Sequence, residues 1–150
     1  MEIYTMNSRI EFGAFELTKE IKDSVNSCLE SGWLTMGPKV EEFQYEWKCL
    51  FGYKHARLLS SGTAADTACC MSLYAYGAQP GDEIICPALS FIATANAIRA
   101  AGFTPVFVDV RKETLNIDET LIEAAITPKT RGIITVNLMG RPSELDVIQQ

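Results

Sequence analysis

Residues 81–110 read GDEIICPALSFIATANAIRAAGFTPVFVDV. This stretch holds two short apolar runs, Glu83–Cys86 and Pro105–Val108, on either side of a segment with helical spacing, Phe91–Ala101. A strand, a helix and a strand in this order are typical of a βαβ unit, in which both strands lie parallel in one sheet. The sequence therefore predicts an α/β fold with three layers, in which helices flank a mostly parallel sheet.

The same alternation continues on both sides of this unit. Further apolar runs occupy Ala56–Leu59 and Gly132–Val136, and the intervening segments Thr63–Tyr76 and Asp118–Ile126 have helical spacing. Turns that contain glycine, such as the one at residues 79–82, separate the elements. We therefore expect a strand at each apolar run, with the first strand directly before a helix.

The region before residue 55 lacks this alternation and predicts helices. Thr18 is a suitable N-cap for a first helix that extends to Ser31. A second helix is expected from Pro38, because proline suits the first turn, and Gly52 is a suitable end. Residues 33–38 between them form a loop.

The pattern divides the chain at residue 55. We expect residues 1–54 to form N-terminal helices joined by a loop, and residues 55–150 to form the first part of a larger domain. Ser143, with Asp146 three residues on, resembles a helix start. A helix that ends two turns later is shorter than the mean, so we expect the domain to be incomplete at its C-terminal side.

Composition excludes several classes of protein. The net charge of −6 and the absence of a basic run argue against a nucleic-acid-binding surface. No apolar stretch reaches the ~20 residues that a membrane helix needs, and residues Met1–Ile10 lack the apolar core of a secretory signal. The sequence therefore predicts a cytoplasmic protein that does not contact membranes or nucleic acids.

The cysteines and the single histidine do not suggest a metal site. The five cysteines lack C-x-x-C or metal-type spacing, and we expect them to be reduced thiols. Cys69 and Cys70 are adjacent in an expected helix and should point to different faces, which argues against a redox pair. His55 has no partner for metal or nucleophilic chemistry, so its role is predicted to be structural.

A candidate phosphate site lies where the first expected strand meets the first expected helix of this domain. Residues 60–66 read SSGTAAD. The first N–H groups of a helix have no intrahelical partner, and small residues let an anion approach them. The hydroxyls of Ser61 and Thr63 can add hydrogen bonds. The same residues also suit a simple helix cap, so both interpretations stay open here.

The later strands end at the same carboxyl-end edge and contribute further candidates. The Phe91 ring follows the second strand and either stacks on a ligand or belongs to the core. Asp109 either holds a ribose or shapes a turn, and a dinucleotide site would need more glycines than Gly62 alone. Asn137 and Arg141 either reach this edge or shape their loop.

Together these segments resemble the sugar aminotransferases of the DegT/DnrJ/EryC/StrS type, which belong to the fold-type I pyridoxal-phosphate enzymes. The order and spacing of the segments hold from about residue 10 to the end of the chain. The matching segments are residues 31–38 (SGWLTMGP), 40–43 (VEEF), 60–65 (SSGTAA), 80–85 (PGDEII), 90–98 (SFIATANAI), 105–110 (PVFVDV), 116–118 (NID), 125–127 (AIT) and 140–142 (GRP).

The resemblance implies a role for each residue of the phosphate turn. Thr63 and Ala64 would bind the phosphate of pyridoxal 5'-phosphate (PLP), Ser61 would add a hydroxyl, and Gly62 would allow close approach. Phe91 would stack on the pyridine ring. Where members often have leucine this chain has Asp66, which leaves the turn intact.

The resemblance also implies a substrate loop and a quaternary structure. The loop residues Trp33, Leu34, Thr35 and Gly37 would help to close the substrate pocket. The family works as a homodimer whose sites use residues from both subunits. Asn137 stands where many members have histidine, so its family contact is not expected to carry over.

The catalytic residues of the family would follow residue 150: an aspartate for the pyridinium nitrogen, a glutamine near the ring hydroxyl and the Schiff-base lysine. We expect the lysines of this chain to lie away from the carboxyl-end edge and the 150 residues alone to be inactive. The lysines are Lys19, Lys22, Lys39, Lys48, Lys54, Lys112 and Lys129.

The implied reaction is transfer of an amino group from glutamate or glutamine to a nucleotide-linked keto sugar, in amino-sugar, cell-surface polysaccharide or antibiotic-sugar biosynthesis. Three alternatives stay open. The first is the family's sugar dehydratase branch, in which histidine replaces the lysine. The second is a non-catalytic phosphate-ligand-binding or dimerising module. The third is a Rossmann-type domain, which the missing glycines disfavour.

Overall fold

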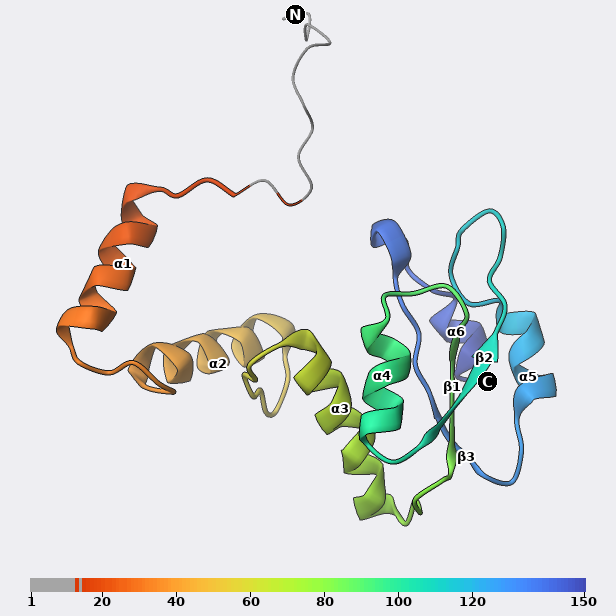
Figure 1. Ribbon diagram of the computed structural model, residues 1–150. Helices are drawn as coiled ribbons and strands as arrows, with labels where there is room; N and C mark the ends of the chain where they lie inside the picture. The colour runs from red at the N-terminus through yellow and green to blue at the C-terminus, as the bar shows by residue number, and fades with distance from the viewer. Residues whose placement is uncertain (1–12, 14) are drawn as a thin grey trace, which may run out of the picture. The chain divides into compact units, whose positions relative to one another are not determined.

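The computed structural model describes Gly13 and residues 15–150 of the 150-residue chain, and the expectation for Met1–Ile10 lies outside this part. The chain divides into two compact units, one up to Arg57 and the other from Leu58 to Gln150. Each unit is described by itself. Figure 1 shows the elements of both units.

The first unit contains two helices, α1 (Lys19–Glu30) and α2 (Pro38–Phe51). The hydroxyl of Thr18 caps α1 by accepting a hydrogen bond from the Ile21 N–H group at 3.4 Å. Gly52 ends α2 in the left-handed conformation, with φ of 70°. Both helices lie where their sequence signals predict them, but neither contains a buried residue.

The second unit is built on a parallel sheet of three strands in the order β2-β1-β3. The strands are β1 (Glu83–Pro87), β2 (Thr104–Val108) and β3 (Thr130–Ile133). The central strand β1 is buried from Ile84 to Pro87. A continuous apolar strand of this kind is typical of parallel sheets, because helices cover both faces.

One face of the sheet is covered by α3 (Gly62–Ser72), the 3₁₀ turn η1 (Leu73–Tyr76) and α4 (Ala93–Ala100). Ile84 and Cys86 of β1 pack there in one apolar cluster with residues of these helices. Cys86 is fully buried, and burial raises the pKa of its thiol to about 11.

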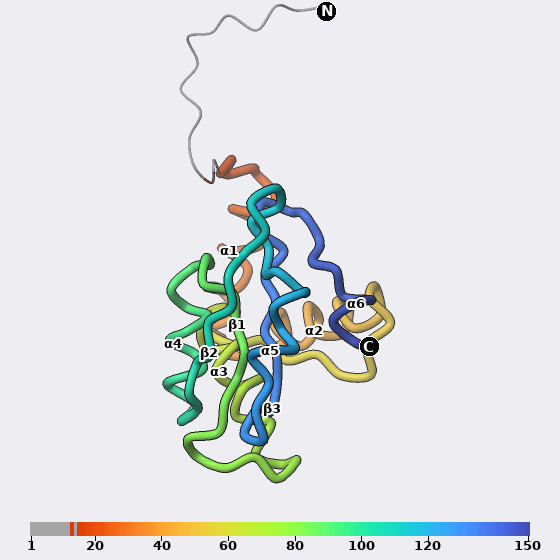
Figure 2. The backbone as a smooth tube through the Cα atoms, turned by 90° about the vertical axis from the view of Figure 1, so that its right-hand side faces the viewer, coloured from red at the N-terminus to blue at the C-terminus, as the bar shows by residue number. Residues whose placement is uncertain are grey.

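The opposite face is covered by shorter elements: η2 (Glu119–Leu121), α5 (Ile122–Ala125) and α6 (Leu145–Ile148). Ile85 of β1 packs on this side with Val108, because successive side chains of a strand point to opposite faces. Figure 1 shows α4 and α5 on opposite sides of the strands, and Figure 2 shows the same elements turned by 90°. The predicted three-layer α/β fold is confirmed.

Two strand predictions are wrong in detail. Residues 56–59 are not a strand, and in the part of the chain that the structure describes no strand pairs with them. An apolar run forms a strand only where a neighbour satisfies its backbone groups. The fourth run was predicted at Gly132–Val136, whereas β3 occupies Thr130–Ile133 and is followed by one further bond, from the Ile134 N–H group to the Ile85 carbonyl at 2.8 Å.

Ser143 was predicted to start the last helix, but it does not cap α6. Its side chain is buried, and its hydroxyl donates to the Val136 carbonyl at 3.3 Å. Its N–H group donates to the Asn137 side-chain oxygen at 3.0 Å. Ser143 therefore closes the loop that precedes α6, which starts at Leu145.

In the described residues no helix is long and apolar enough to cross a membrane. The same residues contain no group of three histidine, cysteine or acidic side chains that could hold a metal ion. Cys70 is buried whereas Cys69 is exposed, so the adjacent thiols do point to different surroundings, as predicted.

Candidate functional site

The candidate site is the edge of the sheet at which the parallel strands end. Residues 88–92, 109–118 and 134–144 continue the chain beyond β1, β2 and β3 at this edge. Although no strand precedes α3, this helix packs beside α4 and runs in the same direction (Figure 1). The first turns of both helices therefore face the carboxyl-end edge.

The turn at the start of α3 was interpreted either as a helix cap or as a phosphate site, and its geometry suits both. Ser61 is the N-cap, because its hydroxyl accepts a hydrogen bond from the Ala64 N–H group at 3.1 Å. Its carbonyl accepts from the Ala65 N–H group at 3.0 Å. Gly62 and Thr63 occupy the first helical positions, where backbone N–H groups have no intrahelical acceptor. The cap therefore uses the Ala64 amide and leaves those of Gly62 and Thr63 for an anion.

The surroundings of this turn are open to solvent. Ser61, Gly62 and Thr63 are exposed, and Ala64 is half-buried. A Cβ atom placed on Gly62 would meet no heavy atom within 4 Å. An anion can thus approach these amides without displacing protein atoms, and the dipole of α3 favours a negative charge there.

Phe91 lies in the segment between β1 and α4 and has an exposed fraction of 77%. The interpretation of Phe91 as a core residue is therefore wrong. Phe91 precedes α4, and the free amides of Gly62 and Thr63 begin α3. Because α4 packs against α3, the ring and the amides lie at the same edge of the sheet.

The predicted substrate loop belongs to the first unit, so the structure describes it apart from the phosphate turn. Trp33 is anchored in this loop, because its indole N–H donates to the Met36 carbonyl at 3.1 Å. The indole covers Gly37, which is buried, and a Cβ atom there would lie 2.2 Å from the indole Cδ1. Leu34 and Thr35 are exposed and line one pocket with Trp33 and Gly37.

The other candidates at the sheet edge take part in hydrogen bonds of their loops. The Asp109 carboxylate accepts a hydrogen bond from the Val110 N–H group at 2.8 Å, which agrees with a turn residue. Asn137 accepts from Ser143, and the Arg141 carbonyl accepts from the Asn116 amide at 2.9 Å. His55 is exposed and belongs to the first unit.

One lysine prediction is wrong. Lys112 lies four residues after the end of β2, within the segment that continues beyond the carboxyl end of that strand. The apolar pattern indicated where β2 ends, but it did not show that the chain stays at this edge as far as residue 118.

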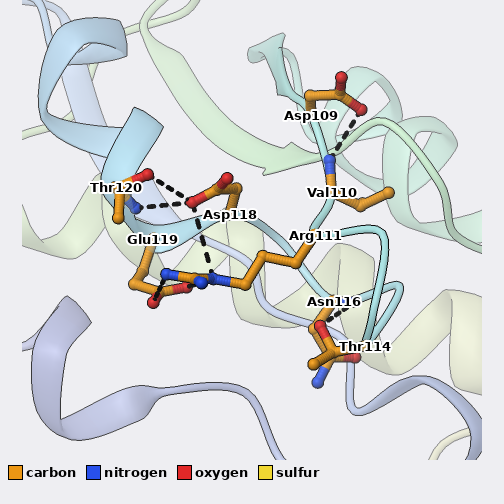
Figure 3. Close-up of polar contacts among 8 residues, drawn as sticks. All are labelled: Asp109, Val110, Arg111, Thr114, Asn116, Asp118, Glu119 and Thr120. Carbon is orange, nitrogen blue, oxygen red and sulfur yellow. Dashed lines mark hydrogen bonds and ion pairs between the residues drawn. The ribbon is translucent and has the colours of Figure 1, made fainter.

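The structure adds a polar cluster that the sequence did not reveal (Figure 3). The Arg111 guanidinium donates to both carboxylate oxygens of Glu119, with an Nε–Oε2 distance of 2.8 Å, and lies 3.7 Å from Asp118. The hydrogen bond from Arg111 lowers the pKa of Glu119, and that from Thr120 lowers the pKa of Asp118. This arrangement keeps both carboxylates charged beside Arg111.

Asn116 is the other residue that sequence reasoning missed as a contact. Its side chain has an exposed fraction of 4% and reaches the loop after β3. The Asn-Ile-Asp segment marked this position, but nothing in the local pattern identifies a partner 25 residues later.

The edge thus presents helix amides, an exposed ring and two loops joined by buried polar contacts. A family model described as the DegT/DnrJ/EryC1/StrS aminotransferase family matches residues 16–150. The chain belongs to this family. Its aminotransferases are PLP-dependent enzymes.

Individual relatives agree with this membership. The chain is 45% identical over 130 residues to the spore coat polysaccharide biosynthesis protein SpsC of Bacillus subtilis, covering 87% of this chain and 33% of SpsC. A solved protein of Streptococcus pneumoniae, described as a sugar aminotransferase in its pyridoxamine-phosphate form, superposes with a TM-score of 0.87 at 35% identity, covering 95% of this chain and 35% of that one.

A second branch of the family is also represented among solved structures. The GDP-4-keto-6-deoxy-D-mannose-3-dehydratase of E. coli, with bound hydrated PLP, superposes with a TM-score of 0.83 at 33% identity. The match covers 91% of this chain and 36% of the dehydratase. The chain therefore spans about a third of the length of the relatives it matches.

Proposed function

We propose that the chain is part of a PLP-dependent aminotransferase that transfers an amino group from glutamate or glutamine to a nucleotide-linked keto sugar. Two relatives support the substrate class: SpsC is named for polysaccharide biosynthesis, and the Streptococcus protein is described as a sugar aminotransferase. The observation that carries the cofactor proposal is the start of α3, where Ser61 caps the helix and leaves the amides of Gly62 and Thr63 available.

The residues at this edge fit the cofactor. The amides of Gly62 and Thr63 suit a phosphate at the helix N-terminus, and the Thr63 hydroxyl can add a hydrogen bond. Phe91 offers an exposed ring for stacking on a flat heteroaromatic group. When bound, PLP supplies an electron sink for the charge that develops as the substrate loses its α-proton. Holding the phosphate and covering the ring are the tasks we assign to this chain.

Substitution of Thr63 tests the site. Thr63→Val in the full-length protein keeps the shape of the side chain and removes its hydroxyl. We expect the affinity for PLP to fall about tenfold, the effect of one lost hydrogen bond to a charged group. The measurement is a titration with PLP followed by its absorbance.

Thr67→Val is the matched control. Thr67 lies one turn later in α3, and its hydroxyl donates to the Thr63 carbonyl at 2.8 Å, so its loss leaves the free amides in place. The control should bind PLP as the unaltered protein does. An unchanged affinity in Thr63→Val would remove Thr63 from the site.

The dehydratase branch is the second candidate, because a solved dehydratase matches 91% of this chain. The two reactions differ in one catalytic residue: the aminotransferases use a Schiff-base lysine, and the dehydratases have a histidine in its place. The full-length aminotransferase should show a cofactor absorbance band that borohydride reduction traps covalently on a lysine. A protein that binds PLP without such trapping supports the dehydratase.

The remaining assignments concern the whole protein. We propose that it acts as a homodimer, that residues Trp33, Leu34, Thr35 and Gly37 help to close the substrate pocket, and that it works in the cytoplasm without a membrane or nucleic-acid partner. All five cysteines are free, which suits a reducing compartment. Sedimentation of the full-length protein tests the dimer, and a monomer at micromolar concentration would contradict it.

A further inference from the structure

Asn116 connects two loops at the carboxyl-end edge that are far apart in sequence. Its side-chain NH₂ group donates to the Arg141 carbonyl at 2.9 Å, and its side-chain oxygen accepts from the Leu138 N–H group at 3.0 Å. The side chain is buried, with an exposed fraction of 4%. Both ends of a buried amide are thus used to hold one short turn.

The backbone of Asn116 is also held by hydrogen bonds. Its N–H group donates to the Thr114 hydroxyl at 3.2 Å, and its carbonyl accepts from the Arg111 N–H group at 2.9 Å. Arg111 in turn is tied to Glu119 (Figure 3). The segment after β2 therefore forms a stable base from which Asn116 reaches the neighbouring loop.

The turn that Asn116 holds contains an unusual conformation. Met139 has φ of 53° and ψ of 26°, in the left-handed region that residues other than glycine seldom adopt. The two side-chain hydrogen bonds of Asn116, accepted from the Leu138 N–H group and donated to the Arg141 carbonyl, lie on either side of it. Such conformations persist where the surrounding structure holds them, and they cluster at functional sites.

The residue in this conformation has an exposed apolar side chain at the proposed ligand edge. Met139 has an exposed fraction of 90%. It follows β3 by six residues, at the edge where the segments after β1 and β2 also lie. A flexible thioether suits contact with a flat or irregular ligand surface.

We propose that Asn116 is a positioning residue, which holds the turn from Leu138 to Arg141 so that Met139 contacts the ligand bound at this edge. The proposal rests on the proposed function, because PLP is the ligand with which it is tested. Asn116 itself does not touch the ligand and acts through the turn.

The test uses Asn116→Asp in the full-length protein. The aspartate keeps the oxygen that accepts from Leu138 and replaces the donor with an oxygen that faces the Arg141 carbonyl. We expect faster amide hydrogen exchange at residues 138–143 and an affinity for PLP about tenfold lower. Met139→Ala, a surface change, should lower the affinity in the same direction without lowering the melting temperature.

Tyr74→Phe is the control for a purely structural effect. The Tyr74 hydroxyl donates to the Ala101 carbonyl at 2.7 Å, beyond the C-terminus of α4 and thus at the opposite end of the sheet. Its loss should lower the melting temperature to a similar extent as Asn116→Asp and leave the affinity for PLP unchanged.

The outcomes separate the two proposals. An unaltered protein that does not bind PLP contradicts the proposed function, and this inference falls with it. If the unaltered protein binds, the inference is overturned by an unchanged affinity in either Asn116→Asp or Met139→Ala, by unchanged exchange at residues 138–143, or by an equal loss of affinity in Tyr74→Phe. A loss of PLP affinity in Asn116→Asp and Met139→Ala, but not in Tyr74→Phe, supports the inference.

Discussion

The two units of the chain bury their apolar residues to very different degrees. In the first unit, neither α1 nor α2 contains a buried residue, and large side chains such as Phe43 and Trp47 remain exposed. In the second unit, Ile84, Ile85 and Cys86 of the central strand have exposed fractions of at most 1%. In the part that the structure describes, the helices of the first unit therefore bury none of their residues, whereas the second unit is organised around β1.

The difference separates local from long-range determinants of structure. α1 and α2 begin and end at capping residues that can be read from neighbouring positions, such as Thr18 and Gly52. The sheet of the second unit depends on strands that are 20 or more residues apart in sequence, such as Glu83 paired with Thr104. Substitutions should accordingly have local effects in the first unit and cooperative effects in the second.

The largest effect is expected from Ile85→Ala. Ile85 has an exposed fraction of 0%, and its truncation should lower the free energy of unfolding by about 2–5 kcal/mol, since the lost contacts leave a cavity. Leu29→Ala is the matched change on the exposed α1, and it should alter the free energy of unfolding by less than about 0.5 kcal/mol. Urea denaturation followed by circular dichroism measures both, and equal effects would abolish the contrast between the units.

A smaller effect is expected from Asp82→Asn, at the amino end of the central strand. The Asp82 carboxylate accepts hydrogen bonds from the Gln79 N–H group at 2.9 Å and from Arg131 at 2.6 Å. The first of these, followed by the second, lowers the pKa of Asp82 below its ordinary value of 3.8. A lowered pKa means that the charged form stabilises the fold above pH 3.8 and that this contribution disappears as the pH falls through the lowered pKa.

The variant should therefore melt at a lower temperature than the unaltered chain at neutral pH, and the two curves should converge in strong acid. Melting temperatures recorded between about pH 7 and about pH 2 provide the measurement. A difference that stays constant over this range would mean that the charge of Asp82 does not contribute.

The smallest effect is expected from Thr18→Ala. Loss of the hydroxyl that accepts from the Ile21 N–H group should reduce the stability of α1 by about 1 kcal/mol or less. Hydrogen exchange of the α1 amides should become faster, while the melting of the sheet stays the same. Ser24→Ala, in the middle of the same helix, serves as the control and should not accelerate exchange, because alanine favours helices.

The sequence predicted those parts of the fold whose signals are local. The βαβ unit from Glu83 to Val108 was read from its apolar runs and its helical spacing. The run at residues 56–59 contains apolar residues but forms no strand, since strand formation requires a neighbour with free backbone groups. The end of β3 was misplaced for a related reason: an apolar run continues to Val136, whereas β3 ends at Ile133 and is followed by one further bond to β1, from the Ile134 N–H group.

The residues of the candidate site likewise divide into those with a local sequence signal and those without one. Ser61, Gly62 and Thr63 could be selected because a helix start has a recognisable pattern of small and hydroxyl residues. The exposure of Phe91 could not be predicted from the residue type, which is more often buried. The contact between Asn116 and Arg141 has no local signal, and a left-handed methionine is unexpected from any propensity.

Because Cys86 is buried, its chemical modification would report unfolding of the sheet. A thiol attacks alkylating reagents as its thiolate, so a pKa of about 11 and complete burial together make Cys86 unreactive while the central strand stays in place. Cys69 and Cys49 are exposed and provide reference thiols in the same molecule. The ratio of modification rates at Cys86 and Cys69, read from peptide masses, would therefore count how often the sheet comes apart under native conditions.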